Sequence, residues 1–188
     1  PFHVEALPEE AAREAVRLAR RLALPLEGYT ADGGFFVEGD SPLLEAHQRL
    51  LGVEAEGADL LRLSSPLVRL QVLAEGEAPV ERLLEALPRG LQAHVAESPK
   101  MPGVRFVSLT KEGVSKLSAA RLVAEAYGLP LSECAMVGDG ENDLELLRAV
   151  GVGIAMGNAP PSVKRAAQRG VAPVEACGLA EALRLLRG

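Results

Sequence analysis

The sequence has no tryptophan, few aromatic residues (3%) and only two cysteines, Cys134 and Cys177, among its 188 residues. A chain of this size can bury a core without covalent cross-links, so the cysteine count argues against a disulfide-stapled scaffold. No apolar run approaches the roughly 20 residues that a membrane-spanning helix needs, and the N-terminus has no charged-then-apolar signal pattern. The composition therefore predicts a soluble protein in a reducing, cytoplasmic setting.

Positive charge is also scarce. The 20 lysines and arginines are outnumbered by 26 aspartates and glutamates, which gives a formal net charge of −6 and a pI near 5.2. Because the basic residues are dispersed among acids, they create no field for gripping a nucleic-acid backbone, and nucleic-acid binding is disfavoured. With 48% hydrophobic residues, the chain has ample capacity for a core, and its length suits one domain or two small ones.

In the first 110 residues, strands outnumber the helices that could connect them. An aromatic-flanked Asp32-Gly33-Gly34 turn predicts a hairpin, in which Asp32 is expected to be a turn residue. Strands that outnumber crossover helices favour a mixed or antiparallel sheet with helices on one face, an α+β unit. The predicted strands are 2–7, 68–74, 91–97 and 104–110 with the hairpin at 28–37, and the predicted helices are 8–24, 42–51 and 79–87.

From Ser115 onward, helices alternate with short, wholly apolar strands. Ser115 is a suitable N-cap for a helix that ends at Gly128, and its apolar residues repeat at helical spacing: Ala119, Leu122, Val123 and Ala126. Alternation of this kind predicts parallel strand pairing in a βαβ layer, so the pattern changes between Thr110 and Val114. The further strands are predicted at 134–137, 152–156 and 171–174, and the further helices at 141–150, 160–168 and 179–186.

The segment 136–158, MVGDGENDLELLRAVGVGIAMGN, holds the candidate chemistry. Asp139 directly follows an apolar strand and precedes a helix, a position at the carboxyl edge of a parallel sheet where ligands bind. The flanking glycines, Gly138 and Gly140, leave room for a ligand beside its carboxylate. Three carboxylates within five residues repel each other unless a cation or ordered donors compensate, and hard oxygen ligands of this kind suit Mg²⁺. They are Asp139, Glu141 and Asp143.

An acidic segment of this kind can also have simpler causes. Acids at a helix start are common simply because they favour the helix dipole and cap free N–H groups. An EF-hand is excluded, because Leu144 replaces its glycine and Val150 its terminal glutamate, and no phosphate-binding glycine loop is present. The glycine-broken strand at 151–157, predicted to end at the same sheet edge, favours the metal hypothesis.

Lys116 is the second candidate site residue. A lysine in the first turn of a helix is poorly placed for the helix dipole, so an anionic ligand would explain its position, although an ordinary solvated lysine is the alternative. The three histidines share no metal-ligand spacing and are expected to be surface or satisfied core residues: His3, His47 and His94.

Two motifs resemble the haloacid dehalogenase (HAD) superfamily of phosphohydrolases, in particular its Cof-like branch with a large α/β cap. GVSKLSAARLVAEAYGL at 113–129 is similar to the lysine motif of that branch, and MVGDGENDLELLRAVGVGIAMGNAPPSVKRAA at 136–167 is similar to its acidic metal-binding motif. The resemblance implies an α/β fold that combines a partial HAD-like Rossmannoid parallel sheet, within 111–188, with an α+β cap domain at 1–110 that sets substrate specificity.

By the same resemblance, Asp139 would bind Mg²⁺ and Asp143 would support the metal site. Lys116 would hold the transferred phosphoryl group, and Asn142 would hydrogen-bond the phosphate oxygens. The implied reaction is attack by an aspartate on the phosphomonoester of a sugar or small metabolite, followed by hydrolysis of the aspartyl-phosphate.

The nucleophile motif of the family, a strand ending in Asp-x-Asp-Gly-Thr, is absent. The aspartates are Asp32, Asp40, Asp59, Asp139 and Asp143, and none has that context. We therefore expect a family member that lacks roughly its first third, is inactive alone, and exposes an apolar sheet edge through which a homodimer would form. The alternative is a catalytically inactive HAD-like module that binds a ligand or partner.

Overall fold

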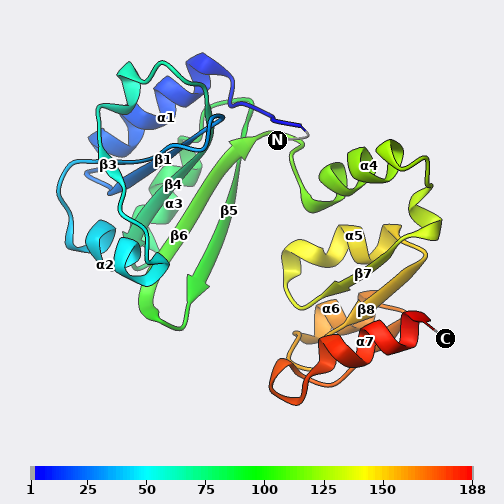
Figure 1. The fold of residues 1–188 in the computed structure, drawn as a ribbon. Coiled ribbons are helices and arrows are strands. Elements are labelled where there is room, and N and C mark those ends of the chain that lie inside the picture. Colours follow the sequence, from blue (N-terminus) through cyan, green and yellow to red (C-terminus); the bar gives the residue numbers. More distant parts are fainter. Residues whose placement is uncertain (1–2, 188) are drawn as a thin grey trace. The chain divides into compact units, whose positions relative to one another are not determined.

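The structure, a computed structural model, describes residues 3–187. The chain divides between Gly113 and Val114 into two compact units, within the stretch where the sequence pattern changes. Figure 1 shows a larger N-terminal sheet, drawn in blue to green, and a smaller C-terminal sheet, drawn in yellow to red. None of the helices in the described part of the chain has both the length and the apolar character to cross a membrane.

The N-terminal unit is a six-stranded sheet in the order β3-β2-β1-β4-β6-β5. All its pairings are antiparallel except that of β2 with β3, so the predicted mixed sheet is confirmed. Its elements are α1 (Glu9–Arg21), β1 (Leu26–Thr30), β2 (Phe35–Glu38), α2 (Pro42–Leu51), β3 (Glu56–Gly57), a 3₁₀ turn (Leu60–Arg62), β4 (Leu67–Glu75), α3 (Ala78–Glu85), β5 (Leu91–Ser98) and β6 (Met101–Lys111).

Local signals define several of these elements. The α2 helix has the predicted bounds because Ser41 caps its start, accepting a hydrogen bond from Leu43 N (3.3 Å), and Gly52 ends it in the left-handed region (φ 68°). The predicted hairpin is formed by β1 and β2, and Asp32 is a turn residue whose carboxylate accepts a hydrogen bond from the Thr30 hydroxyl (2.5 Å).

Two expectations for this unit were wrong. Residues 3–7 of the strand predicted at 2–7 form no ladder: Leu7 N bonds to Leu67 O (2.8 Å), and the Leu7 side chain is buried in the core, while Phe2 lies outside the described residues. The helices also do not share one face of the sheet. The α1 and α3 helices pack on the face of Val72, whereas α2 packs on the opposite face against Leu73 and Phe106.

The C-terminal unit is a parallel three-stranded sheet in the order β7-β8-β9. It confirms the predicted alternation of helices with parallel strands, but only β8 is largely buried, whereas both residues of β9 are exposed. Its elements are α4 (Lys116–Ala126), a 3₁₀ turn (Leu131–Glu133), β7 (Ala135–Gly138), the 3₁₀ turn η3 (Glu141–Asp143), α5 (Leu144–Ala149), β8 (Val152–Ala155), α6 (Pro161–Ala166), β9 (Arg169–Gly170), a 3₁₀ turn (Val174–Ala176) and α7 (Gly178–Arg187).

The predicted strand at 171–174 was wrong. The third strand ends at Gly170, because Pro173 has no N–H to donate and the N–H of Ala172 bonds to the Glu181 carboxylate (2.8 Å) instead of to a ladder. The helix predicted at 141–150 begins as the 3₁₀ turn η3 and becomes α-helical only at Leu144.

The apolar face of α4 is largely exposed. Val123 is 50% exposed, Ala119 and Ala126 are at least partly exposed, and the buried residue of this helix is Ala124. The β7 strand lies at the edge of its sheet and, among the described residues, pairs only with β8. Three of its four residues are nevertheless half-buried or buried.

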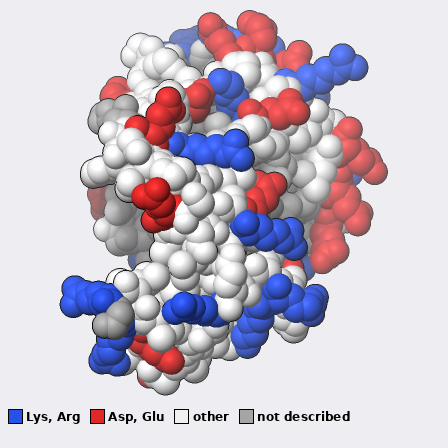
Figure 2. All heavy atoms as spheres, turned by 90° about the vertical axis from the view of Figure 1, so that its right-hand side faces the viewer, with Lys and Arg blue, Asp and Glu red and all other residues white. Residues whose placement is uncertain are grey.

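Charge is dispersed over the surface drawn in Figure 2. On this face, lysine and arginine side chains are separated by uncharged and acidic residues and form no continuous basic patch. A nucleic-acid backbone needs such a patch for non-specific binding.

Candidate active site

The parallel pairing of β7 with β8 brings two polar residues to one sheet edge. Gly138, the last residue of β7, is in register with Ala155, the last residue of β8, so both strands end together as expected. Asp139 follows β7 directly, and Asn158 follows β8 after a short turn. The Asn158 side-chain N–H donates to Asp139 Oδ2 (3.0 Å), which ties the two loops together at the carboxyl edge.

Asp143 is the buried centre of the site, with 2% of its surface exposed. Its Oδ1 accepts a hydrogen bond from Lys116 Nζ (2.5 Å). Its Oδ2 accepts two backbone hydrogen bonds, from the N–H groups of Asp139 and Gly140 (3.1 Å each). The carboxylate therefore holds the loop after β7 in place and anchors the lysine at the same time.

These contacts keep Asp143 ionised. Burial raises the pKa of its carboxyl, but the hydrogen bonds from Lys116 and from two backbone N–H groups outweigh burial and hold the pKa below its usual value. A charged carboxylate at this position is the stronger acceptor for both the ammonium and the backbone donors.

Lys116 is the first residue of α4, where Ser115 and Ser118 form a reciprocal capping box. Its position in the first turn is explained by Asp143, which offsets the unfavourable helix dipole. The lysine side chain is 48% exposed while that of Asp143 is 3% exposed, so part of the ammonium faces outward. Among the residues that the structure describes, Asp143 engages one of its three N–H donors, so the other two can meet an anion from solvent.

The glycines beside Asp139 serve the protein's own carboxylate. A Cβ on Gly138 would lie 2.7 Å from Asp143 Oδ2 and 2.9 Å from its Cγ, which is closer than real contacts allow. The space that the sequence suggested for a ligand beside Gly138 is thus filled by Asp143. Gly138 is required because the buried carboxylate passes directly over it.

Asn142 lies in the same turn as the acids but stands apart from their contacts. Its side chain is exposed and donates to none of them, whereas Glu141 accepts a hydrogen bond from the Ser162 hydroxyl (3.1 Å). Sequence reasoning assigned no role to Asn158 or Ser162. The signal available for Asn158 was its place after an apolar strand that ends beside β7.

Hard oxygen donors at this edge fit Mg²⁺ only in part. Asp139 is exposed, and its Oδ1 accepts no hydrogen bond within residues 3–187, so it is suited to a hydrated Mg²⁺ that keeps most of its waters. Both oxygens of Asp143 already accept hydrogen bonds. In the described part of the chain, no group of three His, Cys, Asp or Glu side chains converges as a metal cage.

The family of haloacid dehalogenase-like hydrolases matches residues 3–183. The chain belongs to this family. The HMP-PP phosphatase of Cronobacter sakazakii is 31% identical over 137 residues, which are 70% of this chain and 48% of that enzyme. A protein of Haemophilus influenzae is 27% identical over 166 residues, 88% of this chain and 62% of that protein.

Solved structures of HAD phosphatases have the same fold. One from Bacteroides thetaiotaomicron is 27% identical with a TM-score of 0.78, and it is matched over 95% of this chain and 65% of its own. A subclass IIB sugar phosphatase is 21% identical with a TM-score of 0.79, covering 98% and 69%. The predicted α/β class and the HAD-like, Cof-like resemblance are thereby confirmed, and the chain spans about two thirds or less of each of these relatives.

Proposed function

We propose that this chain is part of a Mg²⁺-dependent phosphomonoester hydrolase that acts on a sugar phosphate or another small phosphorylated metabolite. One observation carries the proposal. At the carboxyl edge of a parallel sheet, the Asp143 carboxylate accepts hydrogen bonds from both the Lys116 ammonium and the backbone N–H of Asp139, and so holds the lysine beside the Asp139 loop. Phosphatases among the relatives, including an HMP-PP phosphatase and a sugar phosphatase, support a small phosphate ester as the substrate class.

Each residue of the site has a role in this proposal. Lys116 holds a phosphoryl oxygen with the N–H donors that Asp143 leaves unused, and the exposed amide of Asn142 donates to a second oxygen. Asp139 holds Mg²⁺, with Asp143 supporting the site by fixing the backbone of the Asp139 loop. When bound, Mg²⁺ would neutralise negative charge between the phosphate and an attacking carboxylate.

The nucleophile is proposed to come from sequence outside these 188 residues. In the family's reaction, an aspartate oxygen attacks phosphorus, the alcohol leaves, and water then cleaves the aspartyl-phosphate. The C-terminal unit has only two aspartates, Asp139 and Asp143, and both already have roles. The 188-residue chain alone is therefore proposed to be inactive.

The N-terminal unit is proposed to be the cap, approximately residues 1–110, with the residues from 111 onward belonging to the catalytic core. Cap side chains would then choose among phosphate esters. The edge strand β7 supports our prediction that the chain forms a homodimer through this sheet. Light scattering that shows only a monomer would contradict the dimer prediction.

The test uses p-nitrophenyl phosphate with and without Mg²⁺. We expect no turnover by the 188-residue chain and Mg²⁺-dependent turnover by the protein extended with its upstream coding sequence. In the extended protein, Lys116→Met and Asp139→Asn should each lower kcat/KM by about 10²–10³, as is typical for removing one electrostatic contact to a transition state. Lys164→Met, at an exposed lysine of α6, is the matched control and should change little.

Two outcomes would contradict the proposal. If the extended protein turns over neither p-nitrophenyl phosphate nor any phosphorylated metabolite, the hydrolase proposal fails. If Asp139→Asn weakens ligand binding while no rate can be measured in any form of the protein, the chain is an inactive binding module.

A further inference from the structure

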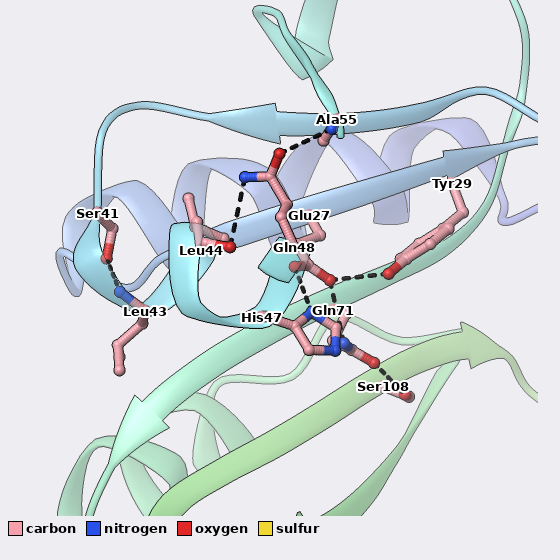
Figure 3. A network of polar contacts seen from close by, with 10 residues as sticks. All are labelled: Glu27, Tyr29, Ser41, Leu43, Leu44, His47, Gln48, Ala55, Gln71 and Ser108. Atoms are coloured by element: carbon pink, nitrogen blue, oxygen red, sulfur yellow. Dashed lines mark hydrogen bonds and ion pairs between the residues drawn. The ribbon is translucent and has the colours of Figure 1, made fainter. Parts of the chain in front are cut away.

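A buried polar network lies under the α2 side of the N-terminal sheet (Figure 3). Glu27 on β1 is fully buried, and its carboxylate lies 2.6 Å from His47 Nδ1 on α2. It also accepts hydrogen bonds from the Tyr29 hydroxyl (2.8 Å) and from Gln71 Nε2 (3.0 Å), while Gln71 accepts one from Ser108 (3.1 Å). A buried carboxylate is tolerated only with such donors, so the network is structurally demanding.

This network fixes the orientation of Tyr29 on the sheet. Its ring stacks on Phe35 of β2, with centroids 4.9 Å apart and 12° between the planes. On β4, the guanidinium carbon of Arg69 lies 3.9 Å from the Tyr29 ring centroid. Because Tyr29 is in register with both residues, its ring stands between the phenyl group and the guanidinium. Arg69 is therefore held in place by an aromatic ring that is itself held by Glu27.

Within residues 3–187, Arg69 has no carboxylate partner at ion-pair distance. The other half-buried arginines of this unit are paired: Arg13 with Glu9, and Arg105 with Glu77 and Glu97. A half-buried guanidinium has lost part of its hydration, and its planar fork matches a carboxylate or a phosphate. The position is consequently suited to an oxyanion.

A second donor lies next to Arg69. The register that pairs Leu70 with Leu109 places Arg69 opposite Thr110 of β6, on the same face of the sheet. The Thr110 oxygen accepts a hydrogen bond from Gln92 Nε2 (3.2 Å), which leaves its own O–H to donate to another acceptor. Both side chains are half-buried, so they can reach a bound ligand without first being uncovered.

We propose that Arg69 and Thr110 form an oxyanion-binding site on the sheet of the N-terminal unit, which takes the carboxylate or phosphate group of a small metabolite. Arg69 supplies the charge and a bidentate fork, and Thr110 supplies one hydroxyl donor. Tyr29, Glu27 and His47 are positioning residues, because they act on the ligand only through the guanidinium. The site uses no metal and no residue of the C-terminal unit, so it does not depend on the proposed hydrolase activity.

Tyrosine fluorescence gives a local test, because the sequence has no tryptophan and only two tyrosines. Tyr127 is 78% exposed on the other unit, so Tyr127→Phe leaves Tyr29 as the single fluorophore beside Arg69. The 188-residue chain with this substitution is titrated with inorganic phosphate and, separately, with malonate, each against sodium chloride at equal ionic strength. The two arms show whether the site prefers phosphate or carboxylate.

We expect a saturable change with at least one of the two anions. Arg69→Met should weaken its binding about tenfold or more, which corresponds to the loss of a charge-assisted hydrogen bond. Thr110→Val should weaken it by a smaller factor. Arg62→Gln is the matched control, since Arg62 is 86% exposed, and Lys116→Met should leave the Tyr29 signal unchanged.

Calorimetry on the same variants covers the case in which Arg69→Met alters the fluorescence baseline, and circular dichroism verifies their folding. The proposal is overturned if neither anion gives a saturable signal above the salt reference. It is also overturned if folded Arg69→Met binds as tightly as Arg62→Gln. Loss of the signal in Lys116→Met would place the anion in the other unit and would likewise refute it.

Discussion

Replacing His47 with leucine should destabilise the N-terminal unit strongly. In the structure, His47 Nδ1 lies 2.6 Å from a Glu27 carboxylate that has no exposed surface. His47→Leu leaves this carboxylate buried with only two neutral donors, Tyr29 and Gln71. The perturbation therefore removes one hydrogen-bond partner of a carboxylate that stays buried in the core.

The magnitude follows from two contributions. Removing a hydrogen-bond partner from a buried carboxylate costs about 1–3 kcal/mol, because the group keeps its desolvation penalty without the contact. Leucine fills most of the space of the imidazole, whose centroid lies 5.1 Å from that of Phe106, so the packing cost should stay below about 1.5 kcal/mol. Together these contributions give an expected loss of about 1–4 kcal/mol in the free energy of unfolding.

A double-mutant cycle separates the charge effect from packing. Glu27→Gln keeps the shape of the side chain but removes its charge, and alone it should cost about 1.5–3 kcal/mol through its weakened hydrogen bonds. Added to His47→Leu, the same substitution replaces the buried carboxylate that His47→Leu has deprived of a partner. The double variant should thus be more stable than the sum of the two single effects predicts, by at least about 1 kcal/mol.

Urea unfolding of the 188-residue chain provides the assay. In a Tyr127→Phe background, fluorescence reports only on Tyr29, which belongs to the same unit as the network. His94→Leu is the matched control at an exposed histidine of β5, and it should change stability by no more than about 0.5 kcal/mol. If the two single effects add within about 0.5 kcal/mol, Glu27 and His47 do not form a coupled buried pair and the reasoning fails.

Three further predictions concern single groups. Gly138→Ala should destabilise the C-terminal unit by about 1–3 kcal/mol in thermal unfolding, because the added Cβ would overlap Asp143. Gly170→Ala is the control and should be tolerated, since the nearest atom to its added Cβ lies 4.0 Å away. Equal destabilisation by the two substitutions would contradict the prediction. Folding lowers the pKa of the Asp143 carboxyl, so the stability that this group contributes is present above its unfolded pKa of about 3.9 and is lost as the pH falls through its folded pKa. In urea unfolding, Asp143→Asn should therefore make the free energy of unfolding less dependent on pH below about pH 4. Burial raises the pKa of Tyr29, so we expect this hydroxyl to ionise only when the chain unfolds. When Tyr127→Phe is titrated to alkaline pH, the absorbance of tyrosinate should rise together with the loss of the circular dichroism signal. Ionisation of Tyr29 in the folded chain would disprove the prediction.

Elements with local boundary signals could be predicted from the sequence. The bounds of α2 were predicted correctly because its cap at Ser41, its first-turn Pro42 and its terminal Gly52 are all signals within or beside the helix itself. The strand predicted at 2–7 failed because a strand exists only where a distant segment supplies a ladder of hydrogen bonds, whereas the one predicted at 171–174 bonds to the β8 segment at Val171 N and Ala172 O but is stopped by Pro173. Leu7 makes a single backbone bond to Leu67, too little for a ladder.

The site shows the same division. The first-turn position of Lys116 indicated that it needs an anion, and the structure supplies one in Asp143. Asn158 was missed because its contact with Asp139 depends on the register of two parallel strands. Glu27 was missed because nothing near it in sequence shows that both faces of its strand are covered, one by α1 and the other by α2.

The two aspartates of the site are not equivalent, although the sequence presents them as one acidic cluster. Asp143 uses both oxygens on Lys116 and on the backbone of its own loop, so its substitution should lower stability and misplace its neighbours. Asp139 is exposed, and within residues 3–187 its carboxylate accepts one hydrogen bond, from Asn158, so its substitution should leave the fold intact and remove only the proposed ligand for a cation. The buried acid therefore builds the edge of the sheet, whereas the exposed acid keeps one carboxylate oxygen without a hydrogen bond from the described residues.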